Sequence, residues 1–456
     1  MAGLHEKCGV FGIYARGLEA ARLAHTGLWT LQHRGQESSG ISAADGDTIR
    51  THKGPGLVAH VYDERSLSSL TGHIAIGHNR YSTSGGAASR HSQPVISGRN
   101  QFALAHNGNL PSVSALSGFA AQHGIDATGA NDSELMHAAI EHVLAQGATP
   151  EDAVRSCFDL FTGVFSVVVM TRNRLAAFRD THGVRPLSIG RLRDGLVVSS
   201  ETCAIDAVGG TFLRDVRPGE LIIVDDAGLH SIRIAEGEEK LDIFEFVYFA
   251  RPDSVLLGRR VNEVRRNLGI HLAREHRVDA DVIIPVPDSA VPAAIGYASE
   301  SRIPLDFGLV KNRYIHRTFI RPAQNLRESG VRMKLNPISE VLRSKSVGVV
   351  DDSIVRGTTA RHIVEMLRRS GARQVHFLVS SPPVRFPDFY GIDTPKPDDL
   401  VAARMSVEDT RQLIGADSLC YLSYEGMIEA TGLPENIFSA SCFNGIYPVE
   451  IGVPEL

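Results

Sequence analysis

The chain has 456 residues, of which 43% are hydrophobic and 22% are charged, with a formal net charge of -5. This length predicts two or three domains of ordinary globular composition. The net negative charge argues against a general nucleic-acid surface, and no apolar run is long enough to span a bilayer. Because the five cysteines are scattered and no signal sequence precedes them, we expect reduced thiols and a cytoplasmic location.

An apolar stretch begins at Cys8, in EKCGVFGIYA, a few residues after the initiator Met. Residues 1–7 lack the apolar core and cleavage site of a signal peptide, so we expect a short leader that is removed. Its removal would give Cys8 both a thiol and a free α-amine, and the amine could then act as general base for the thiol of the same residue. Taken alone, Cys8 is more often a buried structural cysteine, so a catalytic role needs support from other parts of the chain.

Four polar clusters come next along the chain: LQHRGQESSGI (residues 31–41), GHNRYSTSG (77–85), AHNGNL (105–110) and NDSE (131–134). Each alone could be a polar turn. In order and spacing, together with Cys8, they resemble the glutaminase domain of the class II glutamine amidotransferases. This resemblance favours Cys8 as a catalytic nucleophile.

The resemblance implies a role for one or two residues of each later cluster. Arg80 would bind the α-carboxylate of glutamine with its guanidinium fork, and Asp132 would bind the α-ammonium group. Asn107, through its side-chain amide, and Gly108, through its backbone N–H, would form an oxyanion hole. The remaining pocket residues would be Tyr81 and Thr83.

The first half of the chain alternates short apolar runs, such as residues 164–170 and 196–199, with turns. The resemblance implies an α+β fold here, the four-layer αββα sandwich of N-terminal nucleophile hydrolases. A polar segment at residues 235–240 precedes a new apolar run, FEFVYF. We therefore expect a leader at 1–7, a glutamine amidotransferase domain at 8–238 and a second domain at 239–456.

The second half has the pattern of an α/β domain. Strands are expected at residues 281–286 and 375–379, and alternation of strands with helices predicts a parallel sheet with ligands at the carboxyl ends of its strands. One helix is predicted from the spacing of Val261, Val264, Leu268 and Leu272.

The most informative stretch is VGVVDDSIVRGTT, residues 347–359. Its apolar start predicts a buried strand, and a helix with Ile363, Val364 and Leu367 on one face should come after it and end before Gly371. A strand, a turn of small residues and a helix N-terminus together favour a bound phosphate. The carboxylates of Asp351 and Asp352 would repel that phosphate unless they bind ribose hydroxyls and a hydrated Mg²⁺.

This stretch resembles the 5-phosphoribosyl-1-pyrophosphate (PRPP) loop of type I phosphoribosyltransferases. The resemblance implies a bound Mg²⁺ held by Ser289, Asp351 and Asp352. A basic segment, LVKNRYIHRTFIRP (residues 309–322), would close over PRPP and exclude water. The PRPP-binding residues implied are Asp288, Ser289, Lys311, Asp351, Asp352, Ser353, Val355, Arg356, Gly357, Thr358 and Thr359.

Both halves together resemble the glutamine PRPP amidotransferases, which open de novo purine synthesis. The resemblance implies ammonia transfer from glutamine to C1 of PRPP, feedback inhibition by AMP and GMP, and a homodimer or homotetramer. Three alternatives share part of this pattern: a glutamine-dependent transferase acting on another acceptor, a nucleotide-sensing regulator that has lost catalysis, and a paralogue serving a specialised nucleoside pathway. The first would lack VVDDSIVRGTT, and the second would tolerate loss of Cys8, Arg80 or Asn107.

The resemblance fails in one place. Many members of this family hold a [4Fe–4S] cluster with four cysteines, and a cubane cluster needs four thiolates or close substitutes. Here the aligned positions are Asp242, Asp388, Ser439 and Cys442, so we expect no iron–sulfur cluster. How the C-terminal segment FNGIYPVEI packs without one is not predicted by the sequence.

Overall fold

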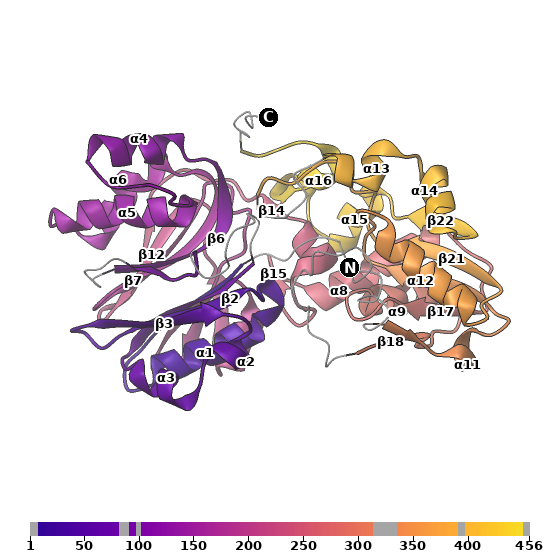
Figure 1. Cartoon of the computed structure of the whole chain (residues 1–456), viewed down its shortest axis with the longest axis horizontal. Helices are drawn as coiled ribbons and strands as arrows, with labels where there is room; N and C mark the ends of the chain where they lie inside the picture. The colour runs from indigo at the N-terminus through magenta and orange to yellow at the C-terminus, as the bar shows by residue number, and fades with distance from the viewer. Residues whose placement is uncertain (1–7, 82–90, 97–101, 313–334, 391–396, 450–456) are drawn as a thin grey trace.

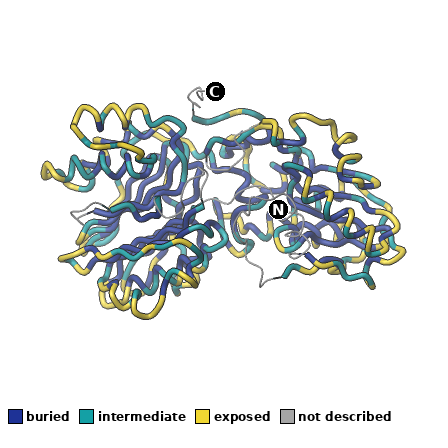
Figure 2. Tube along the Cα trace, in the orientation of Figure 1, coloured by how far each residue is buried: buried dark blue, intermediate teal, exposed yellow. Residues whose placement is uncertain are grey.

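The computed structural model describes residues 8–81, 91–96, 102–312, 335–390 and 397–449. It forms two bodies side by side, the first built from the N-terminal half of the chain and the second from the C-terminal half (Figure 1). In both bodies the central strands are buried, and many of the exposed residues lie on the outer helices and loops (Figure 2).

Two antiparallel sheets face each other in the first body. Val10, Ile76, Ala105 and Val168 point into the space between them and form a continuous apolar core. The seven-stranded sheet has the order β11-β9-β10-β1-β4-β2-β3, with β1 (Gly9–Ala15), β2 (Ser38–Ala44), β3 (Ile49–Pro55), β4 (Ile74–Arg80), β9 (Ser188–Leu192), β10 (Gly195–Ser199) and β11 (Thr211–Asp215). The six-stranded sheet has the order β13-β12-β8-β7-β6-β5, with β5 (Val95–Ile96), β6 (Phe102–Ser112), β7 (Thr162–Thr171), β8 (Leu175–Arg179), β12 (Glu220–Asp225) and β13 (Gly228–Arg233).

Helices cover the outer face of each sheet. Side chains alternate along a strand, so in β1 Val10 faces the other sheet while Phe11 and Ile13 face helices. The seven-stranded sheet packs against α1 (Ala20–Thr30), α2 (Val58–Val61), α3 (Glu64–Ser69) and α7 (Thr202–Ala207), and the six-stranded sheet against α4 (Ser114–Gln122), α5 (Asp132–Ala145) and α6 (Pro150–Cys157). The predicted αββα sandwich is therefore confirmed.

The second body contains a four-stranded parallel sheet of order β17-β20-β21-β22. All six residues of β20 are buried, as expected for a strand covered on both faces. The strands are β17 (Val282–Pro285), β20 (Ser346–Asp351), β21 (Gln374–Val379) and β22 (Ser418–Tyr421). This confirms the predicted parallel sheet, with strand ends within one residue or so of the expected positions.

Helices of the second body pack around this sheet. Val261, Val264, Leu268 and Leu272 are buried on α8, as their spacing predicts, and Gly371 follows the end of α12 with φ +96°. The longer helices are α8 (Val261–Glu275), α9 (Val291–Ser301), α12 (Thr358–Arg369), α14 (Val407–Ile414) and α15 (Tyr424–Thr431). Shorter elements are β14 (Leu241–Asp242), a π-helix (Glu245–Phe249), β15 (Val255–Leu256), β16 (Arg259–Arg260), β18 (Leu309–Lys311), β19 (Leu335–Pro337), α11 (Ser339–Leu342), α13 (Val401–Arg404), β23 (Phe438–Ser439) and α16 (Ser441–Asn444).

Candidate active sites

Cys8 lies one residue before β1, at the end of the seven-stranded sheet. Gly9 pairs with Asn79 in the antiparallel β1–β4 ladder, which places Cys8 beside Arg80. The Cys8 thiol donates to the carbonyl oxygen of Tyr81 at 3.6 Å. Burial raises the pKa of this thiol, and the Tyr81 hydrogen bond and the charge of Arg80 offset only part of that effect. The thiol therefore needs a base to become a nucleophile. The expected leader, residues 1–7, lies outside the described residues.

Charged side chains of both signs, Arg80, Asp132 and Glu37, lie near Cys8. The charge of Arg80 lowers the pKa of the thiol and that of Asp132 raises it, so both lie close to the sulfur. Arg80 is buried, its Nη1 donates to the carbonyl of His91, and within the described residues its Nε has no hydrogen-bond partner. Asp132 is the first residue of α5 and accepts from the backbone N–H of Leu110 at 3.3 Å. A cation and an anion near the same thiol are compatible with the two charges of an α-amino acid.

Asn107 and Gly108 lie next to each other on β6. Asn107 is 1% exposed, and its Nδ2 is buried without a hydrogen-bond partner among the residues that the structure describes. A buried donor without a partner costs stability. The negative charge that develops on an oxyanion would supply a partner for it. Gly108 has φ +154°, and a Cβ there would lie 2.0 Å from the carbonyl oxygen of Val164, so no other residue fits.

The acidic pair of the second body lies at the carboxyl end of β20. Asp351 ends the strand, and its Oδ1 accepts from the backbone N–H of Asp352 at 2.9 Å. Ser289 donates to Asp352 at 2.5 Å and Ser353 donates to it at 2.7 Å. Burial raises the pKa of both carboxyl groups, and the charge of Asp352 raises that of Asp351 further.

The loop after this pair leads into the N-terminus of α12. Gly357 occupies the N-cap position with φ +76°, a conformation that favours glycine. Thr358 and Thr359 form the first turn of α12, whose backbone N–H groups lack partners within the helix and suit a phosphate. Arg356 is held by Asp399 at 3.0 Å, and the carbonyl of Val355 accepts from the N–H of Val401 at 2.8 Å.

A divalent cation is compatible with the acidic pair. In the described part of the chain no group of three His, Cys, Asp or Glu side chains could hold a metal alone. Mg²⁺ is usually held by one or two carboxylates together with waters and substrate phosphates. Asp351 and Asp352, with the hydroxyl of Ser289, fit that pattern.

The basic segment is described only at its start. Lys311, at the end of β18, donates to Asp288 at 2.8 Å, so these two expected PRPP ligands contact each other. Residues 313–334, which carry the other basic side chains of this segment, lie outside the described residues, as does Thr83.

Comparison with known proteins identifies the family. Residues 78–207 match the model of the glutamine amidotransferase domain family. Amidophosphoribosyltransferases from Mycobacterium bovis and Bacillus subtilis are 47% and 45% identical to this chain over 98% of it, and these alignments span 87% and 95% of those proteins. The chain belongs to the amidophosphoribosyltransferase family.

Solved structures agree with this assignment. A structure described as the allosteric regulatory enzyme of purine biosynthesis superposes with a TM-score of 0.92 at 44% identity, covering 98% of each chain. Glutamine phosphoribosylpyrophosphate amidotransferase from B. subtilis, complexed with ADP and GMP, superposes with a TM-score of 0.91 at 45% identity, also over 98% of each chain.

The four positions where many amidophosphoribosyltransferases carry cluster cysteines are buried close together in this chain. Asp242 pairs with Ser439 in a short parallel ladder, and burial raises the pKa of Cys442, with Asp242 and Asp388 adding to the shift. The buried guanidinium of Arg185 donates to Asp242 at 2.9 Å and lies 3.9 Å from Asp388. Three of the four donors are not thiolates and two face a guanidinium, so this donor set does not fit a cubane cluster.

The C-terminal segment packs by hydrogen bonds around these positions, which the sequence did not predict. The carbonyl of Cys442 accepts from the N–H groups of Arg385 and Phe386 at 3.0 and 3.1 Å. Tyr390 donates through its hydroxyl to the carbonyl of Val449 at 2.6 Å, and Tyr447 to the carbonyl of Pro387 at 2.7 Å.

Sequence reasoning also missed a residue that connects the elements carrying Asn107 and Asp132. Gln93 accepts from the N–H of His106 at 2.7 Å and donates to Ser133 at 3.1 Å. It thereby ties β6, which carries Asn107, to the start of α5, which carries Asp132. Gln93 follows the GHNRYSTSG cluster without a motif of its own, so no pattern in the sequence indicates this role.

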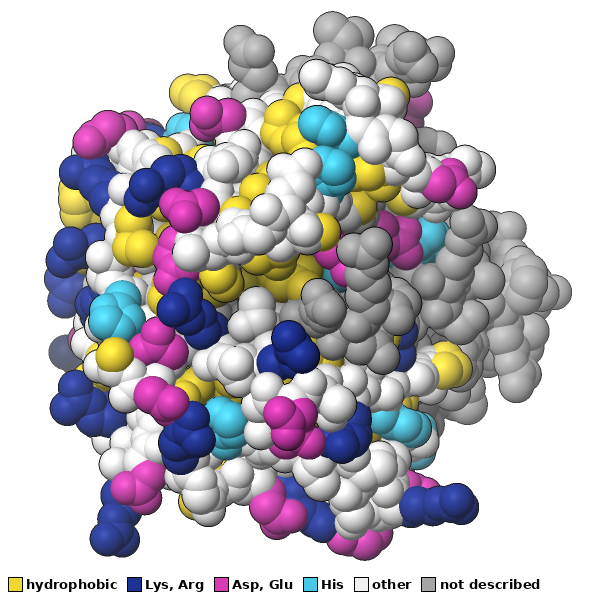
Figure 3. Space-filling view, turned by 90° about the vertical axis from the view of Figure 1, so that its left-hand side faces the viewer, with side chains coloured by type: hydrophobic (Ala, Val, Ile, Leu, Met, Phe, Trp, Pro, Cys, Tyr) yellow, Lys and Arg dark blue, Asp and Glu magenta, His cyan; other side chains and the backbone are white. Residues whose placement is uncertain are grey.

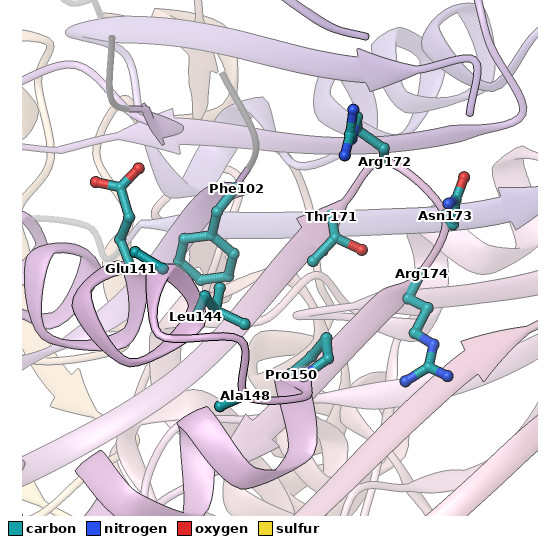
Figure 4. Close-up of a pocket in the computed structure, with 10 residues that line it drawn as sticks. Phe102, Glu141, Leu144, Ala148, Pro150, Thr171, Arg172, Asn173 and Arg174 are labelled. Carbon is teal, nitrogen blue, oxygen red and sulfur yellow. The ribbon is translucent and has the colours of Figure 1, made fainter. Parts of the chain in front are cut away.

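Two further surface features of the first body are a face of mixed charge and a cavity. The end of the first body shows Lys and Arg side chains interspersed with Asp and Glu (Figure 3). A surface cavity of about 290 Å³ lies beside the α5–α6 connection and contains none of the expected site residues (Figure 4). Its lining includes Phe102, Glu141, Leu144, Pro150, Arg172 and Arg174. Among the described residues, no helix has the length and apolarity that a bilayer crossing requires.

Proposed function

We propose that this chain makes 5-phosphoribosylamine, glutamate and pyrophosphate from glutamine, water and PRPP, the first committed step of de novo purine synthesis. One observation carries the proposal: a single chain joins a cysteine flanked by Arg80 and Asp132 to a buried acidic pair that precedes a helix N-terminus. The glutaminase domain would occupy residues 8–238 and the phosphoribosyltransferase domain residues 239–456.

The first half-reaction takes place at Cys8, once the leader is removed and the α-amine is free. The amine accepts the thiol proton, and the sulfur attacks the side-chain amide carbon of glutamine. Asn107 and the N–H of Gly108 stabilise the oxyanion, while Arg80 and Asp132, with Tyr81 and Thr83 alongside, hold the amino-acid end of the substrate. Ammonia leaves with the proton, and water hydrolyses the thioester to glutamate.

The second half-reaction takes place at the carboxyl end of β20. The turn from Ser353 and the first turn of α12 bind the 5′-phosphate, and Asp351 and Asp352 lie near the ribose hydroxyls. Ammonia attacks C1 as the C1–O bond to pyrophosphate breaks, so ammonia must reach this site unprotonated through a dry passage. Mg²⁺ bound by Ser289, Asp351 and Asp352 would neutralise negative charge on pyrophosphate. Closure of residues 309–322 would exclude water.

Several properties extend this proposal. AMP and GMP would inhibit by competing at the PRPP loop, since both resemble phosphoribosyl ligands, and a B. subtilis relative has been solved with ADP and GMP. We also propose a cytoplasmic homodimer or homotetramer that uses Mg²⁺ and has no iron–sulfur cluster. Nucleotide binding undiminished by Asp351→Ala with Asp352→Ala would refute competition at the PRPP loop.

The function is tested by following pyrophosphate and glutamate release in parallel, with the N-terminal mass of the same sample checked. Protein that begins at Cys8 should release both products in equal amounts when glutamine, PRPP and Mg²⁺ are present. A Cys8→Ala variant should release pyrophosphate only when ammonium replaces glutamine. Protein that begins at Cys8 but releases neither product would contradict the proposal and favour a regulator without catalysis.

A further inference from the structure

Asp132, the proposed ligand of the α-ammonium group of glutamine, is held at both of its carboxylate oxygens. The backbone N–H of Ser133 donates to Oδ1 at 2.7 Å, and the Ser133 hydroxyl donates to the same oxygen at 3.3 Å. The backbone N–H of Leu110 donates to Oδ2 at 3.3 Å. Donors on both oxygens restrict rotation of the carboxylate, and its orientation decides where a substrate cation can bind.

The Ser133 hydroxyl lies among buried polar groups from other parts of the chain. Ser133 is 2% exposed. Nε2 of Gln93 donates to its Oγ at 3.1 Å, and Nδ1 of His106 lies 3.0 Å from the same oxygen. A hydroxyl has one proton and two lone pairs, so it can bond to several neighbours at once. These contacts fix the Ser133 hydroxyl beside Asp132.

The imidazole of His106 does not compete with a substrate cation for Asp132. His106 is 2% exposed on β6, next to Asn107, and its Nδ1 lies 3.8 Å from Oδ2 of Asp132. Burial lowers the pKa of His106, and the charge of Asp132 offsets part of that effect. A neutral imidazole leaves the negative charge of Asp132 available to an ammonium group.

One short segment contacts the groups proposed for both ends of the amino acid. Gln93 lies just before β5, two residues after His91, whose carbonyl accepts from Nη1 of Arg80. Nδ1 of His91 lies 3.1 Å from a carboxylate oxygen of Glu134, in the first turn of α5. This segment therefore connects Arg80, at the end of β4, to the helix turn that carries Asp132. It constrains the separation of the two charges, which must suit a carboxylate and an ammonium group on one carbon.

We propose that Ser133 is a positioning residue that selects for substrates with an α-ammonium group. Its hydroxyl, fixed by Gln93 and His106, holds the Asp132 carboxylate in the orientation that accepts the ammonium group. This inference rests on the proposed function. Without the hydroxyl the carboxylate is free to rotate, so the enzyme loses its contact with the ammonium group while the chemistry at Cys8 is retained.

The test compares two ligands that differ only in the α-amine: L-glutamine and glutaramate, which has the same carboxylate and side-chain amide but no amine. On protein that begins at Cys8, glutamate release gives the kcat and the KM for glutamine, and glutaramate added as a competitor gives its inhibition constant. The ammonium preference is the inhibition constant of glutaramate divided by the KM for glutamine. In Ser133→Ala we expect this ratio to fall about tenfold, as for a lost hydrogen bond to a charged group, with kcat within about threefold of the parent value.

Two further variants calibrate the result. Asp132→Asn removes the charge itself, so it should lower the ratio at least as much as Ser133→Ala, and the double variant should lower it no further than Asp132→Asn alone. Ser188→Ala is the matched control, because Ser188 is a completely buried serine on β9 that donates to Asp215 at 2.7 Å. It should leave the ratio unchanged.

An unchanged ratio in Ser133→Ala overturns the inference, whether the two constants stay fixed or rise together. An unchanged ratio in Asp132→Asn also overturns it, because another group would then bind the ammonium group. If Ser133→Ala does not fold, Ser133→Cys, which keeps the shape of the side chain but forms only weak hydrogen bonds, decides in the same assay. A parent chain that releases glutamate without preferring glutamine to glutaramate overturns this inference alone, whereas a parent chain that begins at Cys8 and releases no glutamate overturns the proposed function.

Discussion

Replacing Asn107 by alanine should separate catalysis from stability. The side chain is buried and its Nδ2 has no partner among the described residues. An unsatisfied buried donor costs about 1–3 kcal/mol of folding free energy, which the substitution would recover. The cavity left by the amide group would cost roughly 1 kcal/mol in return. The free energy of unfolding should therefore stay within about 1 kcal/mol of its original value or rise.

Catalysis should respond in the opposite direction. Loss of one oxyanion donor typically lowers kcat by about a hundredfold to a thousandfold, or roughly 2.7–4 kcal/mol of transition-state stabilisation. We expect this loss in glutamate release at saturating glutamine, while ammonium-supported pyrophosphate release stays unchanged. Urea unfolding of the same samples gives the stability.

Asn109 offers a matched control on the same strand. Its Nδ2 donates to the carbonyl of Phe389 at 2.7 Å, so Asn109→Ala removes a satisfied hydrogen bond. That change should lower stability by about 1 kcal/mol and leave the kcat of glutamate release within roughly threefold of the parent value, since no oxyanion donor is lost. A kcat for Asn107→Ala equal to that of the control, with both variants folded, would refute the oxyanion role.

Three further predictions concern binding, charge and pH. Arg80→Lys should raise the KM for glutamine by roughly 10–100-fold, because a lysine cannot form the bidentate contact; steady-state kinetics with an unchanged KM would contradict this. Burial raises the folded-state pKa of Asp351 and Asp352 above the unfolded value, so both groups lower stability at neutral pH. That cost shrinks as the pH falls through the raised pKa and is gone below the unfolded pKa. The variant with both Asp351→Asn and Asp352→Asn should therefore have a higher melting temperature at pH 7. Its ammonium-supported pyrophosphate release should fall by about a hundredfold or more. A lower melting temperature would argue against the stability cost of the two charges. Burial lowers the pKa of His78 to about 3, below its usual value in the unfolded chain, so the unfolded chain binds an extra proton between about pH 6.5 and 3 and stability falls as the pH falls. His78→Gln should reduce the difference in unfolding free energy between pH 7 and pH 5 by about 2 kcal/mol, and an unchanged difference in urea titrations would show that His78 does not contribute.

Local features of the second body could be predicted because their causes are local. The apolar run before Asp351 gives a strand buried on both faces, and the spacing of Ile363, Val364 and Leu367 gives one buried helix face. The candidate glutamine site in the first body remains a prediction from resemblance to a family, since its residues come from separate strands and a helix and no local pattern relates them.

The buried charge networks could not be predicted, because their members are far apart in the sequence. Arg34 and Glu245 form a buried ion pair but are 211 positions apart, and no periodicity or motif relates them. Arg185 and Asp242 are also far apart in the sequence, and only the folded chain brings them within hydrogen-bond distance. Such pairs are determined by tertiary packing, so a sequence shows the charges but not their partners.

The central claim, that one chain moves ammonia from Cys8 to the acidic pair, is tested most directly with isotopes. The protein is supplied with PRPP, Mg²⁺, glutamine labelled with ¹⁵N in its side-chain amide, and excess unlabelled ammonium, and the phosphoribosylamine formed is trapped for mass analysis. We predict a product that carries ¹⁵N in spite of the unlabelled ammonium. A product with the isotope ratio of the solution would mean that the two sites do not share ammonia inside the protein, and would contradict the account.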